Sequence, residues 1–271
     1  MNPEPTLLSL NLPMSNDSKV LEEAIAPFEE AASKLTSEDM QIAIDKSFQA
    51  GTICWTKQEY AESEHGKANA HVGLFEIHAV QNAAQLPGWW TDTHLTSPNR
   101  PLAGLKVVDL SRVIAAPVIT RGLAELGASV MRITASHVCD ISNLHPDLNL
   151  GKWNAFLDMR SETDRRKLKD LILGADVVVQ GYRPGVFDKY GFSQADILGM
   201  CKTRERGIIY VRENCYGWNG PWSLKSGWQQ ISDACCGVSF EFGRAMGNDE
   251  PVTPIFPNSD YWYETLFYHF I

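Results

Sequence analysis

The sequence predicts an α/β protein with a doubly wound, mostly parallel sheet and an N-terminal α+β segment. From residue 101 onward, short apolar strand patterns alternate with amphipathic helix patterns, as in parallel sheets with helices on both faces. The strand patterns are nearly continuous apolar runs, which is typical of strands buried on both sides. The chain has 271 residues, 44% of them hydrophobic, and this is ample for one or two domains.

The first part of the chain divides into an arm and a mixed segment. Residues 1–18 are rich in proline, asparagine and serine, and we expect them to be a flexible arm. Two helices follow, the second beginning at Ser37. Residues 56–70 have a charged helical pattern, whereas residues 73–80 alternate like a strand. We group residues 19–100 as one α+β segment.

The predicted large domain spans residues 101–271. Within it, we expect residues 105–215 to form the sheet, with 177–180 as an interior strand. Ligands of such sheets bind at the carboxyl ends of the strands. The strand patterns cover 105–110, 129–134, 176–180 and 207–214, and the helix patterns cover 116–128, 164–175 and 193–201.

Charge, cysteines and hydropathy limit the class of protein. The net charge of −9 argues against a nucleic-acid partner. The six cysteines form no CxxC pair, which favours reduced thiols inside a cell. Neither a signal peptide nor a run of about 18 apolar residues is present, so we expect no membrane partner. The cytoplasm is the expected compartment, with mitochondria and peroxisomes as open alternatives.

Common cofactor and metal motifs are missing from the sequence. The first predicted strand is followed by DLSRVIAAP, without the glycines of a dinucleotide fingerprint. GxxxxGK[ST], HExxH and GxSxG do not occur, and the seven histidines are dispersed. We therefore expect no metal.

The stretch VVVQGYRPGVFDKYG, at 177–191, brings cations to the end of a buried strand. Arg183 lies in a Pro-Gly turn and Lys189 follows it. A helix starting near Val186 would add free N–H groups that favour an anion. The alternative is a surface turn whose cations are only solvated.

Four further stretches belong together: RPLAGLKVVDLSRVIAAP, LAELGASVMRI, GADVVVQGYRPGVFDKYGF and IIYVRENCYGWNGPW. In this order they resemble the family III CoA-transferases, which include formyl-CoA:oxalate and carnitine CoA-transferases and the alpha-methylacyl-CoA racemases. The resemblance covers about 100–265. Before it, KQEYAESEHGKANAHVGLFEIH resembles the small-domain end of a family copy. The chain thus looks like the tail of one copy followed by the front of another.

The resemblance implies transfer of CoA from an acyl-CoA to a carboxylic acid acceptor through an aspartyl intermediate. The nucleophilic aspartate falls on Asp260 in VTPIFPNSDYWYE; from the residues alone, this aspartate reads as a helix cap. Trp228 stands where the racemases have a histidine, and Gln229 where the family has an acid. Trp228 is neither an acid nor a base, which disfavours racemisation. Gln229 can still position a carboxylate by hydrogen bonds.

The resemblance also places coenzyme A, as substrate, along the strand ends. Of its phosphate contacts, Lys189 replaces a usual arginine and keeps only the charge. At MRITASH, Thr134 and Ala135 replace an acidic and a basic residue of the family, which puts one contact in doubt. The implied CoA-contacting residues are Val113, Ile114, Leu157, Arg183, Val186, Lys189 and Tyr190.

The family's domains continue beyond the nucleophile, whereas this sequence stops eleven residues after Asp260. The glycine-rich loop that covers the family's active site is missing, and we expect the chain to be a C-terminally truncated copy. A full-length protein would be a homodimer. Two readings remain open: an active CoA-transferase, or a catalytically degenerate homologue that binds CoA or acts as a subunit. An acyl-CoA racemase is the less favoured third.

Overall fold

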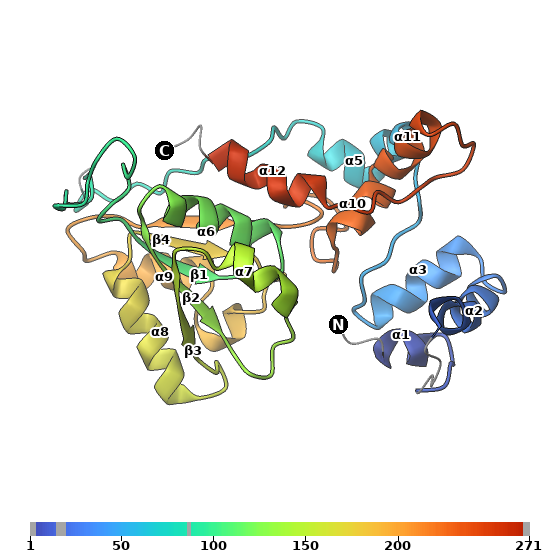
Figure 1. The fold of residues 1–271 in the computed structure, drawn as a ribbon, viewed down its shortest axis with the longest axis horizontal. Coiled ribbons are helices and arrows are strands. Elements are labelled where there is room, and N and C mark those ends of the chain that lie inside the picture. Colours follow the sequence, from blue (N-terminus) through green and yellow to red (C-terminus); the bar gives the residue numbers. More distant parts are fainter. Residues whose placement is uncertain (1–3, 15–19, 86–87, 268–271) are drawn as a thin grey trace. The chain divides into compact units, whose positions relative to one another are not determined.

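The structure is a computed structural model that describes residues 4–14, 20–85 and 88–267 (Figure 1). Its contacts divide the chain into two compact units. The helical unit comprises Met1–Leu74 and Cys215–Pro257, and the sheet unit comprises Phe75–Asn214 and Asn258–Ile271. The domain boundaries expected at residues 18 and 100 remain predictions.

A five-stranded sheet forms the centre of the sheet unit. Its order is β3-β2-β1-β4-β5, and every neighbouring pair is parallel. This confirms the predicted parallel sheet, with β4 in the interior between β1 and β5. The strands are β1 (Lys106–Leu110), β2 (Ser129–Thr134), β3 (Lys152–Phe156), β4 (Val177–Gln180) and β5 (Ile209–Arg212).

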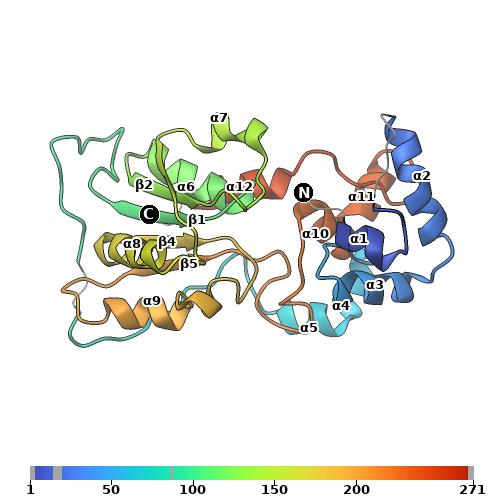
Figure 2. The same ribbon diagram turned by 90° about the horizontal axis from the view of Figure 1, so that it is seen from below.

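Helices cover both faces of this sheet (Figure 2). One core contains Val107 and Val179 and packs against α6 (Ala115–Glu125). The other contains Val108 and Val178 and packs against α8 (Glu162–Gly174) and α9 (Gln194–Cys201). Successive strand residues point to opposite faces, so the apolar run in each strand feeds both cores. The remaining helices of this unit are η1 (Ser142–Leu144), α7 (His145–Leu148), η2 (Asp188–Tyr190) and α12 (Asn258–Phe267).

A buried ion pair joins β1, β3 and α6. The Lys152 ammonium lies 3.1 Å from an oxygen of Asp109, and neither side chain is exposed. Thr120 of α6 donates to the same oxygen at 2.6 Å, and Ser111 donates to the other. Lys152 also donates to the Pro117 carbonyl at 2.8 Å. These bonds satisfy charges that would otherwise be costly to bury, and they fix the first turns of α6.

Short helices make up the helical unit. The predicted start at Ser37 is confirmed, because the Thr36 hydroxyl accepts from the Asp39 N–H and caps the helix there. A helix also occupies part of the predicted arm, with Leu7 buried. The elements are α1 (Glu4–Ser9), α2 (Leu21–Ala32), α3 (Ser37–Lys46), α4 (Lys57–Glu62), α5 (Glu64–Asn69), α10 (Gln229–Cys235) and α11 (Val238–Ala245).

One predicted strand is absent from the structure, and one observed strand was not predicted. Residues 73–80 form no strand, and Leu74, Ile77 and Val80 are each at least two-thirds exposed. The alternating pattern has no neighbouring strand to pair with, so it cannot form a ladder. Conversely, β3 was not predicted, because its apolar side chains Trp153 and Phe156 point outward from an edge strand.

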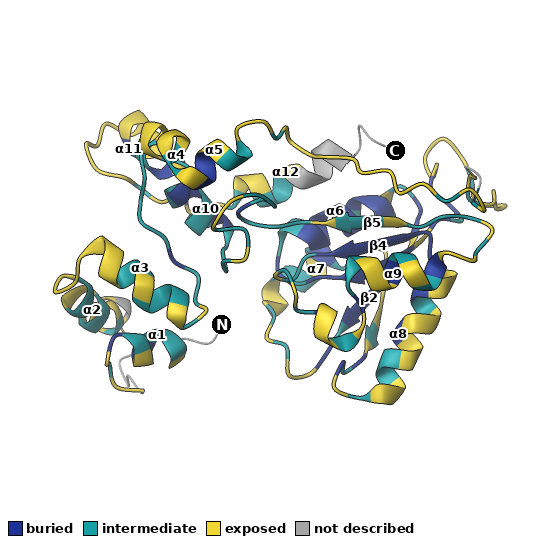
Figure 3. Ribbon diagram, turned by 180° about the vertical axis from the view of Figure 1, so that it is seen from behind, coloured by how far each residue is buried: buried dark blue, intermediate teal, exposed yellow. Residues whose placement is uncertain are grey.

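Burial follows the layers of the sheet unit (Figure 3). The interior strands β1 and β4 and the inner side of α6 are largely buried, whereas the edge strands β3 and β5 and the outer sides of α8 and α9 are more exposed. Among the residues described, no helix is long and apolar enough to cross a membrane.

Candidate active site

The loop between β1 and α6 opens the candidate site at the carboxyl edge of the sheet. Val113 in this loop is buried and has a φ of 68°, a left-handed conformation that is a genuine outlier for a β-branched residue. Ile114 follows as the N-cap of α6, with no side-chain hydrogen bond. Strain of this kind is found preferentially at functional sites. Two residues predicted to line the CoA cleft therefore lie in a loop with a special backbone.

Asp140 holds this loop in place. One of its oxygens accepts from the Val113 N–H at 3.1 Å, and the other forms an ion pair with Arg132. Burial raises the pKa of Asp140, but the N–H groups of Ile141 and Val113 together with the Arg132 charge hold it below its usual value. The anchor is thus ionised near neutral pH and keeps Val113 in position.

The turn after β4 carries the predicted phosphate contacts. Arg183 and Lys189 are exposed, and the Lys189 ammonium lies 5.0 Å from the ring centroid of Tyr190. The helix predicted near Val186 is absent: Asp188–Tyr190 form only a single 3-10 turn, η2, and α9 begins at Gln194. The turn therefore presents its charges without a helix N-terminus. Two left-handed glycines, Gly185 and Gly191, set its shape.

Apolar packing brings three of the predicted residues together. Leu157 lies just beyond β3 and is buried in the core beside α8 and α9. Val186 and Tyr190 are partly buried against the same core. Leu157 is thus a core residue, and its neighbours Val186 and Tyr190 are partly exposed at the surface. The place of Leu157 near adenine remains a prediction.

Sequence analysis missed a cation beside these residues. Arg160 follows β3, and its charge acts on Tyr190. Its guanidinium donates to both oxygens of Asp158, at 2.9 and 2.6 Å, and these bonds lower the pKa of Asp158 to about 2. Arg160 also lies 3.1 Å from a ring nitrogen of His137. No sequence signal marked Arg160, because the strand that precedes it, β3, was not predicted.

Asp260 lies in the first turn of α12, as its third residue. It is half-buried, and α12 packs against α6. The residues before it, 251–257, form no strand, unlike the family pattern. Asp260 is inside the helix and so is not its N-cap, but a carboxylate in a first turn still gains from the helix dipole. The side chains of residues 263–267 lie outside the described part.

A second carboxyl group, also missed from the sequence, lies near Asp260. Glu213 directly follows β5 and is half-buried. Burial and the Asp260 charge raise the pKa of Glu213 to about 7. Glu213 lies inside the strand pattern predicted over 207–214, whereas β5 ends at Arg212, so no sequence signal distinguished it from the strand.

Gln229, the second predicted catalytic residue, belongs to the helical unit. It is the first residue of α10, it is buried, and its amide donates to an Asp233 oxygen at 3.4 Å. Trp228 is the N-cap of the same helix. The predicted role of Gln229 beside Asp260 remains a prediction, since each residue is described within its own unit.

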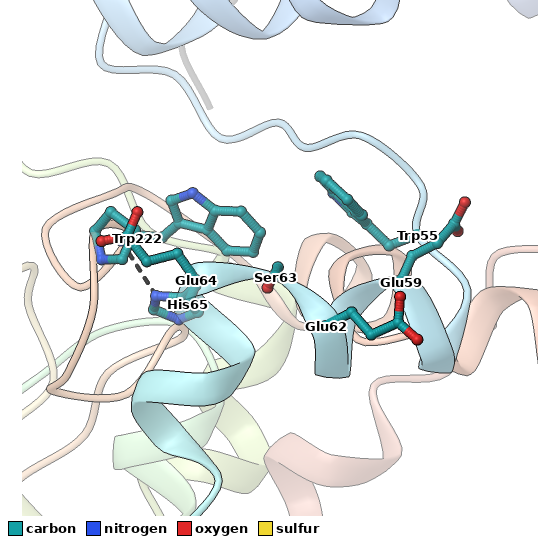
Figure 4. Close-up of a pocket in the computed structure, with 8 residues that line it drawn as sticks. Trp55, Glu59, Glu62, Ser63, Glu64, His65 and Trp222 are labelled. Carbon is teal, nitrogen blue, oxygen red and sulfur yellow. Dashed lines mark hydrogen bonds between the residues drawn. The ribbon is translucent and has the colours of Figure 1, made fainter.

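The helical unit contains a pocket of about 470 Å³ around a buried histidine (Figure 4). The His65 ring stacks on the Trp222 ring, with centroids 4.7 Å apart. Its Nε2 donates to the Tyr216 carbonyl at 2.9 Å, and its Nδ1 accepts from the backbone N–H of Trp222 at 3.2 Å. Burial lowers the pKa of His65, so the ring is neutral and fixed in one tautomer. No predicted site residue lines this pocket; its lining comprises Trp55, Glu59, Glu62, Ser63, Glu64, His65, Pro221 and Trp222.

Over residues 4–14, 20–85 and 88–267, no group of three or more His, Cys, Asp or Glu is placed to hold a metal ion. The site consists instead of carboxylates, cations and apolar side chains.

Comparison with solved structures supports the α/β fold. A hypothetical protein (Rv3272) from Mycobacterium tuberculosis matches 64% of this chain and 49% of its own, with a TM-score of 0.51 and 24% identity. A CAIB/BAIF family protein from Brucella suis matches 62% of this chain and 48% of its own, with a TM-score of 0.51 and 25% identity.

Sequence relatives are more similar. An acetyl-coenzyme A transferase, nodX, from Hypoxylon pulicicidum is 53% identical over 96% of this chain and 45% of its own length. An acyl-CoA transferase from Gibberella moniliformis is 32% identical over 94% and 45%. The chain thus spans just under half the length of these relatives. The model of CoA-transferase family III matches residues 102–265. The chain belongs to CoA-transferase family III.

Proposed function

We propose that the protein transfers CoA between carboxylic acids, taking it from an acyl-CoA thioester. The observation that carries this proposal is the match to the CoA-transferase family III model over residues 102–265, a range that includes the strands β1 to β5. Two relatives that align with 96% and 94% of this chain bear the names acetyl-coenzyme A transferase and acyl-CoA transferase. The substrates are thus an acyl-CoA and a free carboxylic acid.

In this proposal, CoA lies along the carboxyl edge of the sheet. Val113 and Ile114 would line the cleft beside the reacting end, because they sit at the start of α6. Arg183 and Lys189 would meet the phosphates, because both are exposed cations of one turn. Tyr190 and Val186, half-buried on the neighbouring core, offer an apolar surface to the adenosine.

Asp260 is the proposed nucleophile. Its carboxylate would attack the thioester carbonyl, and CoA would leave as the mixed anhydride forms. CoA would then attack the Asp260 carbonyl carbon, which forms an aspartyl-CoA thioester and releases the donor acid as a carboxylate. The acceptor carboxylate would attack this thioester, expel CoA and form a second mixed anhydride. Attack of CoA on the acceptor carbonyl carbon would give the new acyl-CoA and free the Asp260 carboxylate. A position in the first turn of α12 favours the ionised form that this attack requires.

Compartment and assembly are also part of the proposal. We place the protein in the cytoplasm, supported by six cysteines of the described residues that are not joined in disulfides. A homodimer of the full-length protein follows from the family resemblance alone.

Calorimetric titration with CoA tests the proposed cleft. Replacing Arg183 or Lys189 by alanine removes one charge-assisted phosphate contact, so we expect the affinity to fall about tenfold or more. Lys202→Ala is the matched control, since Lys202 is an exposed cation of the same unit at the far end of α9, and its affinity should be unchanged.

Two outcomes would count against the proposal. Equal affinities for all variants would refute the placement of the phosphates. Absence of CoA binding by the wild-type chain would support the degenerate homologue.

A further inference from the structure

We infer that Glu213 is a second carboxyl group of the active site, which holds a proton beside Asp260 and passes it to and from the sulfur of CoA. This inference rests on the proposed role of Asp260. It concerns a residue that the sequence motifs did not single out.

The position of Glu213 is set by three strand ends and one helix. Glu213 follows β5, and its N–H donates to the Gln180 carbonyl of β4 at 3.2 Å, which extends the sheet to this residue. Next to it, Gly181 directly follows β4 and Ser111 directly follows β1. Ala116 lies in the first turn of α6. Glu213 is therefore at the same carboxyl edge as the strained β1–α6 loop.

Gly181 makes room for this carboxylate. A methyl group placed on Gly181 would lie 2.4 Å from the Ala116 Cβ, 3.3 Å from the Ser111 Cβ and 3.5 Å from Oε2 of Glu213. The first distance is too short for any side chain. The absence of a side chain at Gly181 lets α6 approach β4 closely and places the Glu213 oxygen within contact distance of that junction.

The charges around Glu213 favour a held proton. Asp260 of α12 is the ionisable group that acts on Glu213, whereas β1, β4 and α6 bring the neutral Ser111, Gly181 and Ala116. Among the described residues, the charge that shifts the Glu213 pKa is the carboxylate of Asp260 and not an arginine or lysine. Two carboxylates that share a partly dry site do not both ionise easily. Burial and Asp260 accordingly raise the pKa of Glu213 to about 7.

A neutral acid next to a nucleophilic carboxylate suits this reaction. As the Asp260 oxygen bonds to the acyl carbon, the carbon–sulfur bond breaks and the sulfur takes the proton of Glu213. The products are CoA thiol, a mixed anhydride on Asp260 and a Glu213 carboxylate. The thiol then attacks the Asp260 carbonyl carbon, its proton returns to Glu213, and the acyl group leaves as a carboxylate. Proton transfers of this kind contribute about 10²–10⁴-fold to a rate.

The test is the rate at which acetyl-CoA labels Asp260 in a single turnover, measured by mass spectrometry between pH 5.5 and 8.5. We expect the wild-type rate to fall above about pH 7, as Glu213 loses its proton. Glu213→Gln should label at least tenfold more slowly and lose this pH dependence. Glu205→Gln, an exposed glutamate before β5, is the control and should match the wild type. Equal rates and pH profiles for wild type and Glu213→Gln would overturn the inference.

A second measurement separates this inference from the proposed function. Carbon-13 NMR of labelled glutamate follows Glu213 directly, its signal being identified by its loss in Glu213→Gln. We expect titration near pH 7 in the wild type and a lower midpoint in Asp260→Asn. If acetyl-CoA never labels the wild type, the proposed function and the proton-transfer role both fail, and this titration then shows whether the carboxyl pair exists. A midpoint near 4.5 in both proteins would overturn the pair itself.

Discussion

Replacing Asp109 by asparagine should be the most damaging single change beneath the site. The substitution keeps the shape of the side chain but removes the charge that faces Lys152 at 3.1 Å, where neither side chain is exposed. An ammonium left buried without its partner costs about 3–5 kcal/mol of unfolding free energy. Lys152 can limit this cost by losing its proton. Burial lowers the pKa of Lys152, and in the variant the Asp109 charge that opposes this effect is gone.

Two further variants make this prediction specific. Adding Lys152→Met to Asp109→Asn removes both charges and should recover most of the lost stability. Glu162→Gln removes one partner of an ion pair with Arg166 whose side chains are 68% and 73% exposed, and should change stability by no more than about 0.5 kcal/mol.

Urea unfolding followed by circular dichroism measures all four proteins. A loss below about 1 kcal/mol in Asp109→Asn would refute the reasoning, as would a double variant no more stable than the single one. Since the pair anchors α6, the loop that carries Val113 should loosen with it. Hydrogen exchange at the Val113 amide, which donates to Asp140, would report that loosening.

Two further predictions concern the junction at Glu213. Gly181→Ala should destabilise the sheet unit by at least about 1 kcal/mol in urea unfolding, because its methyl group would lie 2.4 Å from Ala116, whereas Gly199→Ala, in open space on α9, should stabilise it by up to about 1 kcal/mol. Glu213→Gln should be more stable than the wild type above pH 7 by about 1–3 kcal/mol, with no difference below pH 4.5. The sign follows because the folded carboxyl keeps its proton to about pH 7 while the unfolded one loses it near 4.5, so wild-type stability is lost as pH rises through this window. Equal stability changes in Gly181→Ala and Gly199→Ala would contradict the first expectation. A stability difference between Glu213→Gln and the wild type that does not change with pH would contradict the second.

Local pattern predicted every strand of the described sheet except the edge strand β3. β1 and β4 are apolar runs buried on both faces, so composition alone identifies them. The strand β3 was not predicted, because its large apolar residues face outward and give no buried pattern. Residues 73–80 were wrongly predicted as a strand, because an alternating pattern forms a strand only where a partner strand is available.

The candidate site divides in the same way. The turn with Arg183 and Lys189 could be read from sequence, because its cations follow a recognisable strand. The pairing of Lys152 with Asp109 could not, since 43 residues separate them. The approach of Glu213 to Asp260 likewise depends on how α12 packs on α6. Contacts between residues far apart in sequence leave no local signal.

Identifying the residue that carries the acyl group tests the central claim most directly. The chain is incubated with acetyl-CoA, trapped with hydroxylamine and digested, and the modified peptide is sequenced by mass spectrometry. The account predicts modification at Asp260, its loss in Asp260→Asn, and its retention in Asp170→Asn, which alters an exposed aspartate on α8. Transfer of CoA that persists in Asp260→Asn, or a label on another residue, would contradict it.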